Sequence, residues 1–210
     1  MTCAFPAQIC GPAGLPRRFQ AFATQVGPPA VELWTMQFAG SGTEDRAYFE
    51  VQMPHAWAAG TADPAAKMIY PHIHVVPMGR PAAVQTMLWE FDYSVTNPEA
   101  VGAAGYPVAT TSSLYCNVAV DPDDFTPAAP ALITHRPHYM ANFGTTPVAH
   151  GIDTTGWDIS AIMICRIIRR TAAPLPAGFV ADDYTQFASL LSFDIHYALN
   201  AWGSRDITIK

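Results

Sequence analysis

The sequence predicts an all-β protein: an antiparallel β-sandwich, or jelly roll, with an extended N-terminal arm. Apolar and polar residues alternate with a period of two in most segments after Arg46, as they do in half-buried strands. Nineteen prolines and fourteen glycines interrupt the chain at short intervals, which disfavours long helices. About eight strand-like segments joined by turns are typical of a sandwich or jelly roll. The 210 residues fit one domain.

The N-terminal part of the chain differs in composition from the rest. Residues 1–30 are rich in proline, glycine and alanine and have no sustained period, so we expect an extended arm there, followed by a single sandwich domain over 31–210. The arm holds one basic pair, Arg17 and Arg18. We expect this pair to contact an acidic patch on a neighbouring protein, with a solvated arm as an equal alternative.

The alternation assigns a core-facing set to each strand-like segment. These sets are Phe49, Val51 and Met53; Met87, Trp89, Phe91 and Tyr93; Leu114, Cys116, Val118 and Val120; and Leu191, Phe193, Ile195 and Tyr197. The segment 158–169 is apolar on both faces and rich in isoleucine, which predicts a central strand rather than a buried helix. The pair Asp182 and Asp183 predicts the start of one short helical turn.

Charge and apolar content restrict the classes of partner. Charged residues make up 13% of the chain, against about 25% in typical soluble domains, and the net charge is −6. A chain with so few charges is expected to cover part of its surface by self-association or by docking on a large assembly. The sequence contains no basic stripe, so we expect no binding to nucleic acid. No apolar run reaches the roughly 20 residues that span a bilayer, and the first residues lack the order of a signal peptide, so we expect synthesis in a cytoplasm.

The four cysteines predict neither a disulfide framework nor a metal site. None belongs to a CxxC pair, and their spacing does not match that of zinc sites. Cys116 and Cys165 are expected to act as small hydrophobic residues in strands. Outside the histidines, the sequence offers no ligand pattern, and we expect no cofactor.

A histidine pair is the strongest candidate for chemistry. The run YPHIH places His72 and His74 on one side of a strand, because side chains alternate every two residues. This HxH pair resembles the first motif of cupins, and His138 opens a loose HxxxN like the second. Where cupins have a glutamate after the second histidine, this chain has Met78 and Gly79. A metal site of His72, His74 and His138 is therefore the lesser alternative, and we expect no bound metal.

The favoured interpretation of these histidines is structural. His55, His72, His74 and His196 stand beside apolar or aromatic strand residues, and Asp194 shares a face with His196. A buried network of these five side chains would fix strand register, because each buried polar group requires a partner.

No pattern for covalent or cofactor-dependent catalysis is present in the sequence. It has no GxSxG elbow, no Walker or dinucleotide-binding glycine pattern, and no cysteine or serine in a recognisable local context with histidine. We therefore expect no enzymatic activity and name no catalytic residue.

Three short motifs follow one another along the chain: MPHAW at 53–57, PHIH at 71–74 and FDIHY…GS at 193–204. In this order they resemble the motifs of a family of tailed-bacteriophage virion structural proteins, and the resemblance runs from about Tyr48 to Arg205. It implies an assembly protein with a jelly-roll-like fold and no enzymatic activity.

The role that we expect from this resemblance is capsid decoration. The protein would dock on the lattice of the major capsid protein, stabilise the head as a cement protein and occur as a homotrimer on the virion surface. Alternatives are a tail or head-fibre component, a receptor-binding module that recognises carbohydrate, and a cupin-type metalloenzyme.

Overall fold

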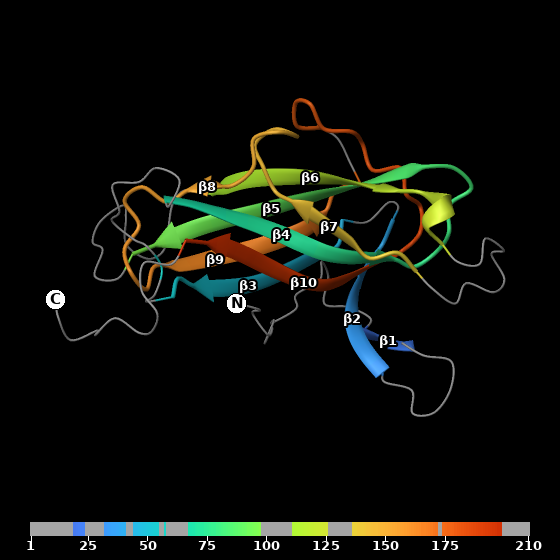
Figure 1. The fold of residues 1–210 in the computed structure, drawn as a ribbon, viewed down its shortest axis with the longest axis horizontal. Helices are drawn as coiled ribbons and strands as arrows, with labels where there is room; N and C mark the ends of the chain where they lie inside the picture. The colour runs from blue at the N-terminus through green and yellow to red at the C-terminus, as the bar shows by residue number, and fades with distance from the viewer. Residues whose placement is uncertain are drawn as a thin grey trace.

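Two antiparallel sheets pack face to face in the computed structural model (Figure 1). The structure describes residues 19–23, 32–40, 44–54, 57, 67–97, 111–125, 136–171 and 174–198. The first sheet consists, in spatial order, of β1 (Phe19–Ala23), β2 (Glu32–Phe38), β10 (Ala188–Tyr197), β4 (Met68–Pro77) and β7 (Tyr139–Asn142), with β8 (Ile152–Asp153) also paired to β4. The second sheet consists of β3 (Arg46–Gln52), β9 (Ile162–Arg169), β5 (Gln85–Thr96) and β6 (Ser112–Val120).

The strand order is that of a jelly roll. β2 pairs with β10, β3 with β9, β4 with β7 and β5 with β6, so strands from the two halves of the chain lie side by side. The chain also alternates between sheets, because β2 and β4 belong to the first sheet while β3 and β5 belong to the second. Eight strands arranged in this way make two interlocked Greek keys. The predicted fold class is confirmed.

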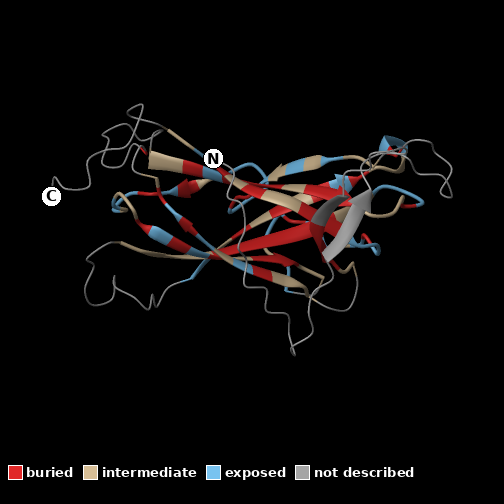
Figure 2. Cartoon of the chain, turned by 90° about the horizontal axis from the view of Figure 1, so that it is seen from below, coloured by how far each residue is buried: buried red, intermediate tan, exposed pale blue. Residues whose placement is uncertain are grey.

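The core lies between the sheets, where buried residues concentrate along the strands (Figure 2). The predicted core-facing sets of β3, β5 and β6 are confirmed, since their members belong to or pack against one hydrophobic cluster. β10 differs at one position: a register shift between Leu190 and Ser192 brings Leu190, rather than the predicted Leu191, into the core. A β-bulge of this kind adds one residue and reverses the alternation on one side of it.

The isoleucine-rich segment is a central strand, as predicted. β9 pairs with β3 on one side and with β5 on the other. β-branched side chains suit such a strand because they pack well on a pleated surface. Cys116 and Cys165 are buried in the hydrophobic cluster, in line with their expected role as small hydrophobic residues.

Part of the predicted arm is a strand. Phe19–Ala23 pairs antiparallel with Glu32–Met36, which the composition of residues 1–30 did not predict. β10 pairs with β2 only over Met36–Phe38, so β1 and the start of β2 extend past the sandwich as a two-stranded ribbon (Figure 1). Arg17 and Arg18 lie outside the described residues.

The predicted helical turn at Asp182 and Asp183 is wrong. Residues 181–187 are irregular, and the carboxylates of Asp182 and Asp183 accept hydrogen bonds from the backbone of β5, at Leu88 N and Thr86 N. The one helical element with bounds inside the described part of the chain is a 3-10 turn at Pro122–Asp124. Among all the residues that the structure describes, no helix is long and apolar enough to cross a membrane.

Candidate functional site

The outer face of the first sheet carries a cluster of histidines beside one carboxylate. Along β4, Ile73 and Val75 face the core, so His72 and His74 point to the opposite side of the sheet. Asp194 of β10 lies directly across the strand pair from His72. The histidine cluster is therefore produced by a period-two pair on one strand and by the register of its neighbour.

The side chains of the cluster converge on one oxygen atom. Nε2 of His74 lies 3.3 Å from Oδ2 of Asp194, and Nε2 of His72 lies 3.8 Å from the same atom. The Ser192 hydroxyl also donates to this oxygen, at 2.9 Å. On the other side of its ring, His74 Nδ1 forms a hydrogen bond of 2.7 Å with Nε2 of His138.

The imidazoles form a continuous row across the sheet. The ring centroids of His196 and His72 are 4.5 Å apart, those of His72 and His74 are 5.0 Å apart, and those of His74 and His138 are 4.8 Å apart. Burial and the neighbouring His74 lower the pKa of His138. At least part of the row is therefore held in the neutral form, in which imidazole nitrogen has a lone pair available.

His72 is the buried member of the row. Its exposed fraction is 2%, and burial is the main reason that its pKa is lowered. The neighbouring His196 and His74 lower it further, whereas the backbone of Tyr70 and the carboxylate of Asp194 act in the opposite direction. A neutral imidazole has a lone pair on one ring nitrogen, and the nitrogen of His72 that faces Asp194 is Nε2.

The structure brings together four of the five residues of the predicted network: His72, His74, Asp194 and His196. His55 lies outside the described residues. The alternative metal site was predicted to use His138 as the third ligand beside His72 and His74. In the structure, the third group whose ligand atom lies near theirs is Asp194. The cluster also faces outward, whereas apolar side chains fill the space between the sheets.

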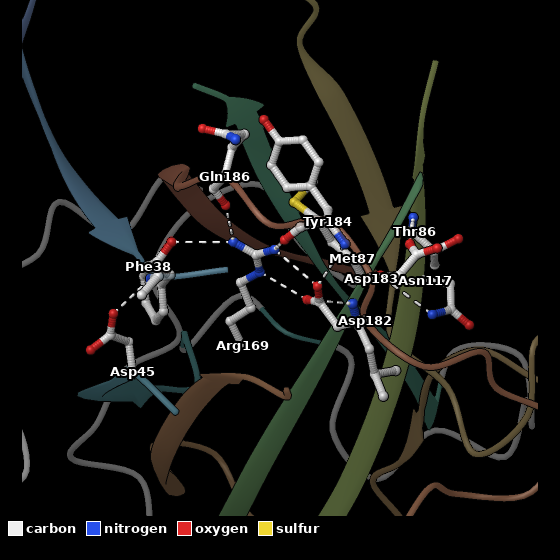
Figure 3. A network of polar contacts seen from close by, with 12 residues as sticks. Phe38, Asp45, Thr86, Met87, Asn117, Arg169, Asp182, Asp183, Tyr184 and Gln186 are labelled. Carbon is white, nitrogen blue, oxygen red and sulfur yellow. Dashed lines mark hydrogen bonds and ion pairs between the residues drawn. The ribbon is translucent and has the colours of Figure 1, made fainter. Parts of the chain in front are cut away.

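A second polar site, which the sequence analysis did not predict, is centred on Arg169 (Figure 3). Its guanidinium binds both carboxylate oxygens of Asp182, at 2.8 and 2.9 Å, and both side chains are fully buried. It also donates to the backbone carbonyls of Phe38, Tyr184 and Gln186. Arg169 follows the core-facing parity of β9, and a charged residue at that parity is the signal that could have revealed the site.

A third polar group lies on the outer face of the second sheet. Arg170 Nη1 donates to Glu90 at 2.6 Å, and Arg166 Nε donates to Asp92 at 2.8 Å. Burial and the adjacent Asp92 raise the pKa of Glu90 to about 7, while Arg170 opposes this shift. These groups cross-link β5 and β9 through their outer face.

A shallow hollow lies where the free edges of the two sheets meet, between β6 and β7. It has a volume of about 200 Å³. Its walls combine aromatic, amide and apolar side chains: Tyr115, Cys116, Asn117, Met140, Ala141, Asn142, Pro147, His150 and Phe179. The hollow is smaller than the roughly 300–1,000 Å³ of drug-sized ligand sites, so it suits a single small group.

Comparison of the chain with models of known protein families, with curated proteins and with solved structures finds no match. Functional inference therefore depends on the geometry of the described residues and on the motifs of the sequence.

Proposed function

We propose that this protein is a structural component of a tailed-bacteriophage particle, a decoration protein that docks on the lattice of the major capsid protein. The observation that carries the proposal is the two-stranded ribbon of β1 and the first residues of β2, which reaches beyond the sandwich (Figure 1).

The ribbon has strand edges that another chain could pair with. Residues 32–35 of β2 pair with β1 on one side and lie beyond the reach of β10 on the other, within the part of the chain that is described. A two-stranded ribbon is marginally stable alone in water, and its open edges offer backbone groups to another chain. Pairing with a strand of a neighbouring subunit would satisfy those groups and attach the protein to an assembly.

Two further observations support an assembly role. Jelly rolls occur in viral capsid proteins, although the same fold serves lectins and cupins, so the fold alone does not decide. The low content of charged residues, 13%, fits a surface that neighbours partly cover. Large apolar side chains such as Val148 and Val180 are also exposed, at 88% and 59%.

The proposal includes self-association as a homotrimer on the virion surface. Homo-oligomers usually have closed symmetry, and threefold positions of a capsid lattice would accept a trimer. Light scattering of the purified full-length chain tests this directly: a mass three times that of the monomer supports it, and a monomer at micromolar concentration contradicts it.

Location in the intact particle is the decisive test of the function. Cryo-electron microscopy of virions should reveal density for the sandwich seated on the head lattice, with the ribbon against an adjacent subunit. Density confined to the tail tip would exclude decoration and favour a receptor-binding role.

The second candidate function is that of a receptor-binding module that recognises carbohydrate, and the hollow between β6 and β7 supports it. Aromatic rings such as Phe179 beside amide groups such as Asn142 are suited to stacking on and hydrogen bonding to a sugar. Titration of the labelled protein with host surface glycans, followed by NMR, tests this role. Shifts confined to the hollow would support it, and no shift at millimolar glycan would count against it.

A further inference from the structure

We propose that His72, His74 and Asp194 bind one divalent transition-metal ion of the zinc class on the outer face of the first sheet. The inference stands apart from the proposed role in the particle, because it depends only on the side chains of β4 and β10.

The spacing of the three groups suits tetrahedral coordination. Ligand atoms that lie 2.0–2.2 Å from a zinc ion are about 3.3–3.6 Å from one another. The two distances from imidazole nitrogen to the Asp194 oxygen, 3.3 Å for His74 and 3.8 Å for His72, lie close to this range. All three ligand atoms lie within 4.8 Å of one another, so side-chain movements of about an ångström would close the site.

Without an ion, the cluster leaves His72 poorly satisfied. This side chain is almost fully buried, yet its Nε2 lies at 3.8 Å from Asp194, beyond hydrogen-bond length. Its Nδ1 is also buried without a hydrogen bond of standard geometry to any described residue. Burial of an imidazole in this state is costly, and a metal bond would satisfy its Nε2.

The surroundings of His74 match those of a metal ligand. Ligating histidines almost always use their second ring nitrogen in a hydrogen bond, which fixes the tautomer and the ring orientation. His74 does so through Nδ1, which lies 2.7 Å from Nε2 of His138. When Nδ1 donates this bond, Nε2 presents its lone pair toward Asp194. We therefore assign His138 as a positioning residue.

The donor set selects the class of metal. Two imidazole nitrogens and one carboxylate suit zinc and neighbouring transition metals, whereas calcium and magnesium require sites made of oxygen atoms. The site also has an entry path, because the His74 and Asp194 side chains retain 23% and 18% of their exposure. A water molecule from this exposed side would be the fourth ligand.

Metal titration of the full-length protein tests the site. After treatment with a chelator, the wild-type chain should bind Zn²⁺ with a stoichiometry of one by calorimetry, and Co²⁺ should give the visible absorption of a four-coordinate complex. Mg²⁺ and Ca²⁺ should not compete. Absence of saturable Zn²⁺ binding would overturn the proposal.

Matched variants locate the ion. His74→Gln and Asp194→Asn should each weaken Zn²⁺ binding by about 100-fold or more, and His138→Gln by about 10–100-fold, as expected for a positioning residue. His150→Gln, which changes an exposed histidine outside the cluster, should bind as the wild type does. Equal affinity in the wild type and Asp194→Asn would place the ion elsewhere and contradict the assignment.

A measurement on the unmodified protein covers the case in which a variant does not fold. In long-range ¹H–¹⁵N spectra, the Nε2 resonances of His72 and His74 should shift on addition of Zn²⁺, while those of His150 stay unchanged. Zn²⁺ binding that leaves both Nε2 resonances in place would overturn the proposal.

Discussion

The guanidinium of Arg169 and the carboxylate of Asp182 form a two-point ion pair in which neither side chain is exposed to solvent (Figure 3). Arg169 ends β9, and Asp182 belongs to the irregular segment that leads into β10. Further bonds from Arg169 to the Phe38 and Gln186 carbonyls join the end of β2 to the same segment. One side chain thus connects both sheets at this end of the sandwich.

Asp182→Asn should destabilise the protein strongly. The amide keeps the shape of the carboxylate but leaves the Arg169 charge buried without a counterion, which typically costs about 3–5 kcal/mol. Chemical denaturation gives the free energy of unfolding. The matched control is Asp123→Asn, because Asp123 is 91% exposed and lies 3.8 Å from Arg80; its cost should stay below about 1 kcal/mol. Equal costs for the two variants would contradict this account of the pair.

Gly40→Ala should show how tightly the segment after Asp182 packs against the end of β2. A Cβ at Gly40 would lie 2.4 Å from the carbonyl oxygens of Tyr184 and Gln186, so the backbone would have to move. Overpacking of this kind costs about 1–3 kcal/mol. At Gly79 an added Cβ meets only the flexible side chain of Gln186. Gly79→Ala should therefore cost clearly less in the same denaturation experiment, and the reverse order would refute the packing argument.

Glu90 should make stability depend on pH. Its pKa rises from 4.5 to about 7 on folding, so between these values the folded protein binds more protons than the unfolded chain. The free energy of unfolding should then fall as pH rises from about 4.5 to 7, by at most about 3 kcal/mol, and level off above that window.

Substitution identifies the group that causes this slope. Glu90→Gln removes the titrating carboxyl, so thermal midpoints measured across the window should lose much of their dependence on pH. Glu50→Gln changes an exposed carboxyl on the same sheet face and should leave the slope as in the wild type. A slope that persists in Glu90→Gln would assign the effect to another group.

Local periodicity predicted much of the fold, because several of the jelly-roll strands are buried mainly on one face and alternate accordingly. It could not predict β1, because residues 19–23 lie in a stretch with the composition of an arm and no sustained period. It also placed Leu191 in the core, because one added residue at a bulge is invisible to a period-two pattern.

The candidate site was predictable only in part, because local periodicity does not reveal the register between strands. The period of β4 put His72 and His74 on one face, but the register with β10 decides that Asp194 lies opposite His72. Arg169 and Asp182 are 13 residues apart with no sequence pattern that links them.

Deletion of residues 1–30 should separate folding from attachment to the particle. It removes β1, which pairs with β2 and with no other strand of the described chain, and it leaves the strand pairs of the jelly roll in place. The truncated chain should therefore keep its thermal midpoint within a few degrees and keep its self-association. Its affinity for capsids stripped of the protein should fall by about tenfold or more, equivalent to about 1.4 kcal/mol.

A control variant distinguishes the ribbon from the charges of the arm. Full-length protein with Arg17→Ala and Arg18→Ala keeps β1 but loses the basic pair, so an intermediate loss of affinity that disappears at high salt would assign that part to charge. If the deletion binds capsids as tightly as the full chain, the ribbon has no docking role. If the deletion does not fold, β1 is required by the sandwich itself, and the boundary at residue 30 is wrong.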